Sequence, residues 1–368
     1  MLSSKSVLTS NSSPVFFEKG AKVACGAVKI INLFGTWHEM GRQYGALLKQ
    51  ELSDVSSFAE QYVEKNGETA VKVLLAQWSQ ISYTIHAFME GMAQTSGLSL
   101  SQLYRANAVE RLCGLPECSC AIAWDDYAKD DLIVGRNYDY GESFFAMKNN
   151  LVTAVFHPAD GSLATAAIGY VGEIYATNAI NEKGIFMELN NGSPSAPILP
   201  PNDRIIGTTL LLNTMFQAHS LDYFDAFFNT SLCSESYIIN VCDTNNAHSY
   251  EWCPVGCKKG CQNMPDGLLL STNHYQNSEW DLAHPTDQTS WLSFLRLNNL
   301  RKQCDAEKGM LDPQKMMKIM QTDEDHGGSA NALTVYQYVV VPKTMQLWLR
   351  IIGAADWTPI DLKSFLLP

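Results

Sequence analysis

The pattern of apolar residues changes near residue 118, and this change constrains the fold more than any other feature of the chain. Upstream, apolar side chains recur at the spacing of an amphipathic helix, as in the stretch 40–55. Downstream, short β-type runs at 118–124 and 132–138 flank a charged turn, and runs at 151–157 and 163–169 flank an Asp-Gly turn. Strands followed by helices and then by more strands predict antiparallel sheets packed between helices, an α+β fold.

The remaining elements divide the chain into two parts. Upstream we expect one strand at 27–34, helices at 40–55 and 74–93, and a third helix that starts at the capping box of Ser99 and Gln102. The segment 1–117 is therefore predicted to be mainly helical. For 118–368 we also expect strands at 174–180, 184–189, 236–242, 248–252, 334–341 and 346–351, and helices at 208–218, 220–229, 290–303 and 313–321.

Composition excludes several classes of function. The chain has 368 residues, 46% of them hydrophobic and 17% charged, which is enough apolar material for a large buried core. Its formal net charge of -12 leaves no surplus of Lys and Arg for nucleic acid. No apolar run reaches the ~18 residues of a membrane span. Residues 1–14 lack the apolar core of a secretory signal, so a cytoplasmic location, or export by a signal outside this sequence, both stay open.

Ten cysteines are many for a chain of this size. Cys253, Cys257 and Cys261 follow one another at intervals of four in a turn rich in Gly and Lys. This spacing matches no common zinc pattern, so free thiols or a local disulfide are favoured over a metal site. We expect no metal and no cofactor.

Cys118 stands at the junction between the two parts of the chain. It follows the turn-like run 114–117 and begins a strand, and a thiol placed after a flexible loop can serve as an exposed nucleophile. The alternative is a buried structural cysteine, because Cys120 falls on the same strand face.

Four groups of motifs carry a resemblance to a known family. The run CSCAIA at 118–123, followed by GRNYDY at 135–140, resembles the nucleophile strand of the choloylglycine hydrolases. It is more similar still to the relatives of acyl-coenzyme A:6-aminopenicillanate acyltransferase. The runs NEKG at 181–184 with Leu189-Asn190, and STNH at 271–274, agree with those families in order and spacing. Upstream, 35–45 and 90–98 resemble the acyltransferase-type propeptide, and 117 residues precede the cysteine, as in that type.

This resemblance implies an N-terminal-nucleophile hydrolase. The expected fold is a four-layer αββα sandwich with a helical N-terminal propeptide, divided into a propeptide or α chain at 1–117 and a catalytic β chain at 118–368. The chain is expected to cut its own Glu117–Cys118 bond. The two products would stay associated, and a homo-oligomer is possible.

The resemblance also implies roles for five residues. Cys118 is the nucleophile, and its freed α-amine is the base that takes the thiol proton. Asp139 holds that amine, and the charge of Arg136 lies near the thiol and favours the thiolate. Asn190 and Asn273 are the expected oxyanion donors, through their side-chain N–H groups. The alternative for the first pair is a purely structural Arg–Asp contact.

One departure from the family pattern concerns a further arginine. The families often carry an Arg near the start of the helix that follows the second Asn motif. The corresponding position here is Ser293, and Arg296 lies one helical turn further on.

The expected activity is hydrolysis of a linear amide C–N bond through an acyl-thioester on Cys118. An acyl-CoA-dependent N-acyltransferase is the first alternative, although no phosphate-cradling glycine motif stands out. A non-catalytic scaffold with a decayed site is the second. The expected partner is a small-molecule N-acyl amide, with no nucleic acid and no membrane. Bile-salt conjugates, β-lactam side chains, acylated amino acids and peptide-like amines are the candidate substrates.

Overall fold

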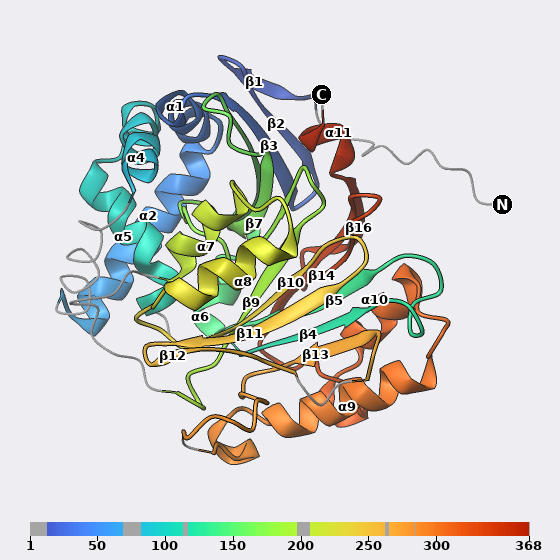
Figure 1. Cartoon of the computed structure of the whole chain (residues 1–368). Coiled ribbons are helices and arrows are strands. Elements are labelled where there is room, and N and C mark those ends of the chain that lie inside the picture. The colour runs from blue at the N-terminus through green and yellow to red at the C-terminus, as the bar shows by residue number, and fades with distance from the viewer. Residues whose placement is uncertain are drawn as a thin grey trace.

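The computed structural model describes residues 13–68, 82–112, 117–196, 207–261, 265–282 and 284–367, and these form two β-sheets with helices outside them (Figure 1). One sheet has ten strands and the other has six. The sheets face each other, because β4 (Glu117–Ala123) of the smaller sheet packs on β9 (Phe186–Asn191) of the larger. Helices, sheet, sheet and helices follow one another across the molecule, which confirms the expected four-layer αββα sandwich.

The larger sheet begins with three strands from the segment before residue 118. One of them, β3, matches the strand expected at 27–34, whereas β1 and β2 were not expected because both are short and poorly alternating. β3 pairs in parallel with β6, Ile30 opposite Thr153, so backbone hydrogen bonds join the two parts of the chain within one sheet. The strands in spatial order are β1 (Val15–Phe17), β2 (Gly20–Cys25), β3 (Val28–Gly35), β6 (Leu151–Pro158), β7 (Thr165–Tyr170), β8 (Asn178–Asn181), β9, β10 (Tyr237–Cys242), β11 (Ala247–Cys253) and β12 (Gly256–Lys259).

Helices cover the outer face of this sheet, with those of the upstream segment at one end (Figure 1). The helix expected at 40–55 is two helices, α1 and α2, which meet at Leu48. The helix expected at 74–93 begins at Tyr83 in the described part of the chain, and residues 74–81 lie outside it. The helices on this side are α1 (Trp37–Leu47), α2 (Lys49–Asn66), α4 (Tyr83–Ser96), α5 (Leu100–Leu112), α7 (Gly207–Met215) and α8 (Leu221–Thr230). Two four-residue helices, α6 (Glu142–Phe145) and α11 (Lys363–Leu366), each follow the last residues of a strand of the smaller sheet.

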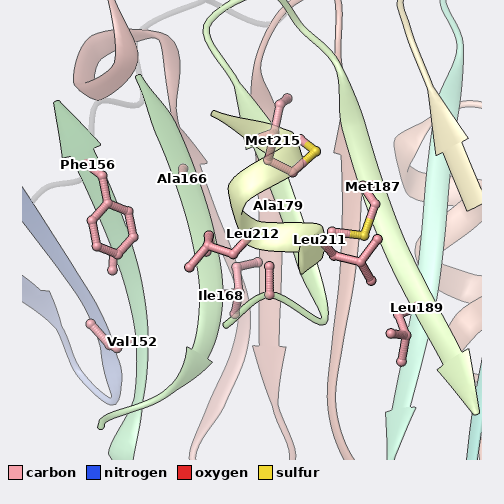
Figure 2. Packing of buried hydrophobic residues seen from close by; sticks show 14 of the residues in the cluster. Val152, Phe156, Ala166, Ile168, Ala179, Met187, Leu189, Leu211, Leu212 and Met215 are labelled. Atoms are coloured by element: carbon pink, nitrogen blue, oxygen red, sulfur yellow. The ribbon is translucent and has the colours of Figure 1, made fainter. Parts of the chain in front are cut away.

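The two faces of the larger sheet differ in polarity. Figure 2 shows the outer face, where Leu211, Leu212 and Met215 of α7 pack on apolar strand residues such as Ile168 and Met187. Because side chains alternate along a strand, the intervening residues point the other way, toward the smaller sheet. Several of these inward-pointing residues are buried and polar: Thr153, Asn178, Glu188 and Asn190. A polar layer thus lies between the sheets.

The smaller sheet carries the cysteine strand, β4, between the edge strand β13 and β5. α9 (Ser293–Ala306) and α10 (Pro313–Gln321) cover its outer face. The hairpin expected from 334–351 is present as β14 and β15, whereas β13 and β16 were not expected. The strands in spatial order are β13 (Leu268–Ser271), β4, β5 (Ile133–Asp139), β14 (Thr334–Val341), β15 (Gln346–Ile351) and β16 (Ala355–Asp361).

No helix in the described ranges combines the length and the low polarity that a bilayer span requires.

Candidate active site

Cys118 is the second residue of β4, and its side chain is fully buried between the sheets. β4 pairs with β5, so that Cys118 lies opposite Tyr138 and Cys120 lies opposite Arg136. Residues that face each other across an antiparallel pair share one side of the sheet. The hairpin expected from the two motifs therefore brings Arg136 to the same side of the sheet as the Cys118 thiol.

Arg136 contacts the thiol directly. Its Nη2 donates to Cys118 Sγ at 3.3 Å and also to the carbonyl oxygen of Leu189. Its Nη1 donates to Thr177 O at 2.9 Å, and its Nε lies 3.1 Å from Glu188 Oε2 in an ion pair. Arg136 and Glu188 are both fully buried, and a buried charge is costly without a partner. Each side chain therefore depends on the opposite charge of the other.

The Cys118 thiol is protonated at neutral pH. Burial raises its pKa to about 11, while the charge of Arg136 and the backbone N–H of Asp139 pull the pKa down. A free thiol ordinarily has a pKa near ~8.5, and the thiolate is the reactive form. Residues 117 and 118 are continuous within β4, so the nitrogen of Cys118 is an amide, which is not basic.

The backbone of Cys118 is held at both of its polar atoms. Its N–H donates to Asn273 Oδ1 at 3.1 Å, and its carbonyl oxygen accepts from Arg296 Nη1 at 3.1 Å. Arg296 Nη2 donates to the same Asn273 Oδ1 at 2.7 Å, which fixes the orientation of that amide. Asn273 and Arg296 are both fully buried.

A strained turn places Arg296. Trp291 and Leu292 precede α9 with φ angles of 55° and 54°, a left-handed conformation that residues with a Cβ rarely adopt. The carbonyl oxygen of Trp291 accepts from Arg296 Nε at 3.0 Å. Strain of this kind persists where surrounding contacts hold it, and it concentrates at functional sites.

Asp139 lies three residues after Arg136 and so points to the opposite face of β5. Its carboxylate accepts from Thr334 Oγ1 at 2.6 Å, and its Oδ2 lies 3.7 Å from Arg296 Nη1. Burial raises the pKa of Asp139 to about 7, although Arg296 and the Thr334 hydroxyl both lower it. Asp139 is paired in register with Glu117, the residue on the other side of the bond that we expect to be cut.

The two asparagines expected to donate to an oxyanion use their side-chain N–H groups elsewhere in this structure. Asn190 Nδ2 donates to Ser271 Oγ at 2.8 Å, a bond that links the two sheets. Asn273 Nδ2 donates to Asn191 O at 2.9 Å. Asn273 thus meets Cys118 through its oxygen, and the oxyanion role stays a prediction for both residues.

Two charged residues of the site were not predicted to act there. One is Arg296, which lies one helical turn beyond Ser293, the position where the family pattern often has an arginine. Ser293 Oγ accepts from the backbone N–H of Asn273 at 2.7 Å, so it supports the residue that Arg296 also holds. Glu188 was not singled out, although an acid within the run Phe186–Asn191 is a signal that sequence analysis could have used.

The cysteine-rich hairpin lies at the edge of the larger sheet. Cys253 ends β11 and Cys257 lies in β12, and all nine cysteines in the described ranges are free thiols. In the same ranges, no group of three or more His, Cys, Asp or Glu side chains is arranged to hold a metal ion.

The fold and the site define a four-layer αββα protein with a buried cysteine near the start of β4, whose sulfur, nitrogen and carbonyl oxygen each contact a polar side chain. No protein-family model matches the chain, and no curated protein does.

Among solved structures, the chain is similar to an N-acylethanolamine-hydrolyzing acid amidase ortholog from Caenorhabditis elegans, with 17% identity over 61% of this chain and 93% of that one, and a TM-score of 0.45. A conjugated bile acid hydrolase mutant from Clostridium perfringens has 14% identity over 67% of this chain and 93% of its own, with a TM-score of 0.46. Penicillin V acylase from Agrobacterium tumefaciens has 9% identity over 67% and 86%, with a TM-score of 0.39. These similarities are distant, so the function proposed below rests on the contacts of Cys118.

Proposed function

We propose that the chain is a self-processing cysteine amidohydrolase, which frees Cys118 as a new N-terminus and then hydrolyses a linear N-acyl amide. One observation carries the proposal. The sulfur, nitrogen and carbonyl oxygen of Cys118 are each held by a buried polar side chain, namely Arg136, Asn273 and Arg296. A cysteine that only fills space in a strand needs no such partners, and burying two arginines is unfavourable unless their charges are used.

Self-processing would begin with attack of the Cys118 sulfur on the carbonyl carbon of Glu117. A C–S bond forms, the Glu117–Cys118 C–N bond breaks, and the thiol proton passes to the departing nitrogen. Water then cleaves the thioester, giving a carboxylic acid on Glu117 and restoring the thiol. Asn273 Oδ1, which accepts from this nitrogen at 3.1 Å before the cut, is placed to accept from the new amine afterwards.

Turnover would use the two groups that cleavage brings together. The α-amine of Cys118, with a pKa near ~8, takes the thiol proton, and the sulfur attacks the acyl carbon of the substrate. The departing amine leaves with that proton, and water hydrolyses the acyl-thioester. The guanidinium of Arg136 at 3.3 Å favours the thiolate during both attacks.

Intact mass and N-terminal sequencing of the purified protein test the processing step. We expect two chains, the second beginning Cys-Ser-Cys-Ala, and we expect Cys118→Ala to remain a single chain. Cys120→Ala is the matched control, because Cys120 is a buried thiol two residues along the same strand face. The proposal fails if wild-type protein is active as one uncut chain, or if Cys118→Ala is cut at the same bond.

Release of primary amine from a panel of N-acyl amides tests the activity. The processed protein should hydrolyse at least one amide class in water alone, and Cys118→Ala should not. A requirement for an acyl-CoA donor, with amide formed from an added amine, would instead identify the transferase. If Cys118→Ala kept full activity, Cys118 would not be the nucleophile.

A further inference from the structure

The loop between β7 and β8, residues 171–177, is buried or half-buried along its whole length and joins the upstream segment to the thiol. A buried loop has to find partners for its backbone N–H groups, because a donor left without one in the interior is costly. The partners of this loop come from both parts of the chain.

At its start the loop is held by helices of the upstream segment. Tyr44 Oη of α1 accepts the N–H of Gly172 at 2.9 Å, and Asn107 Oδ1 of α5 accepts the N–H of Ile174 at 3.4 Å. Gly172 has φ of 94°, and a Cβ there would lie 3.5 Å from both Leu52 and Ala106, so the backbone sits directly on these helices. Tyr44 and Asn107 are themselves almost fully buried.

At its end the loop holds Arg136. The carbonyl oxygen of Thr177 accepts from Arg136 Nη1 at 2.9 Å and from the N–H of Leu189 at 2.9 Å. Arg136 in turn donates to Cys118 Sγ at 3.3 Å. Only four residues lie between Gly172, which contacts Tyr44, and Thr177, which contacts Arg136, so the two ends of the loop cannot move far apart from each other.

We propose that Tyr44 is a positioning residue for the nucleophile: its hydroxyl fixes the 171–177 loop, and the loop fixes the guanidinium that faces Cys118. This inference rests on the proposed function. The inference adds that the segment before Cys118 supports the active site after cleavage, in addition to blocking the α-amine before it. The Tyr44 hydroxyl contacts the Gly172 N–H, so its effect reaches Cys118 through the loop and Arg136.

Tyr44→Phe isolates the hydroxyl. The ring that packs edge-on against Phe88 at 5.5 Å is retained, whereas the buried N–H of Gly172 loses its acceptor. A displaced loop withdraws Arg136 from the sulfur. We then expect the apparent pKa of the Cys118 thiol to rise by about one unit, which corresponds to roughly tenfold less thiolate below the pKa. kcat should fall by a similar factor, with a smaller change in KM.

Tyr83→Phe is the matched control, because Tyr83 belongs to the same upstream segment and is 85% exposed. For each protein, the rate of Cys118 alkylation by iodoacetamide is followed from pH 6 to pH 11 by peptide mass, alongside kcat and KM. A shifted alkylation profile in Tyr44→Phe alone supports the inference. Equal profiles in the two variants overturn it, even if Tyr44→Phe lowers the melting temperature, since that result would make the contact merely structural.

The two proposals fail in different ways. If wild-type protein is not cut before Cys118, the proposed function fails before any variant is compared. The alkylation comparison remains decisive for Tyr44 in that case, because the contact between Arg136 and the sulfur is already present in the uncut chain.

Discussion

The buried ion pair between Arg136 and Glu188 gives a quantitative test of how the site is held. Both side chains are fully buried, and Nε and Oε2 are 3.1 Å apart. Burial raises the pKa of Glu188 and the charge of Arg136 lowers it, so each charge depends on the other. We consider Arg136→Met, Glu188→Gln and the double variant, all in a Cys118→Ala background, which excludes the proposed self-cleavage.

Each single change leaves one buried charge without its partner. Breaking a buried pair in this way typically costs about 3–5 kcal/mol of the free energy of unfolding. Arg136→Met also removes the donor to Leu189 O, whereas Thr177 O keeps its bond from the N–H of Leu189. The double variant has no unpaired charge. We therefore expect it to lose about as much as Arg136→Met alone, so that the two effects couple by about 2 kcal/mol or more.

Unfolding by guanidinium chloride at pH 7.5 of the background protein, the two single variants and the double variant gives the double-mutant cycle. Similar slopes of free energy against denaturant in all four would show that the same surface is exposed on unfolding. Additive losses, within about 0.5 kcal/mol, would refute the claim that the two charges depend on each other. The side chain of Arg136 would then have to be stabilised by the carbonyl oxygens of Thr177 and Leu189 alone.

Two further predictions concern stability, both in the Cys118→Ala background. Burial raises the pKa of Glu251 to about 7 from an ordinary 4.5, so the folded chain binds an extra proton between these values and stability falls as pH rises through this window. Glu251→Gln removes this pH dependence. In urea unfolding, the free energy of unfolding of Glu251→Gln minus that of its Glu251 parent should increase by up to about 3 kcal/mol from pH 4.5 to pH 8. A difference that does not change with pH would contradict the titration of Glu251. Gly41→Ala should lower the melting temperature although alanine favours helices, because its Cβ would lie 1.9 Å from Phe88 O where α1 crosses α4. The exposed change Ser53→Ala is the control, and equal melting temperatures would exclude close packing at that crossing.

The sequence predicted the site best where local pattern decides the structure. The charged turn between 124 and 132 fixes the β4–β5 hairpin, and alternation then places Arg136 on the face of Cys118. The same alternation places Asp139 on the other face, where it contacts Thr334 and Arg296, while the nitrogen of Cys118 donates to Asn273. The layer order also followed from local pattern, since strands and helices alternate in long blocks along the chain.

Contacts between distant segments could not be predicted in the same way. Arg296 reaches Cys118 O from 178 positions along the chain, and it does so because α9 starts after two left-handed residues that no propensity favours. The amide of Asn273 faces Cys118 with its oxygen because Arg296 holds that oxygen from the other side. The orientation of an amide depends on such neighbours, which become known only when the chain is folded.

The parallel pairing of β3 with β6 has a consequence for any attempt to produce residues 118–368 without the upstream segment. A gene that starts at codon 118 would leave β6 as a bare edge strand, with the row of N–H and C=O groups that normally pair with Ile30 to Gly35 open to other molecules. Such a product should collect in inclusion bodies. Supplying residues 1–117 from a second gene in the same cell would close that edge, so a split-gene enzyme needs both halves during folding.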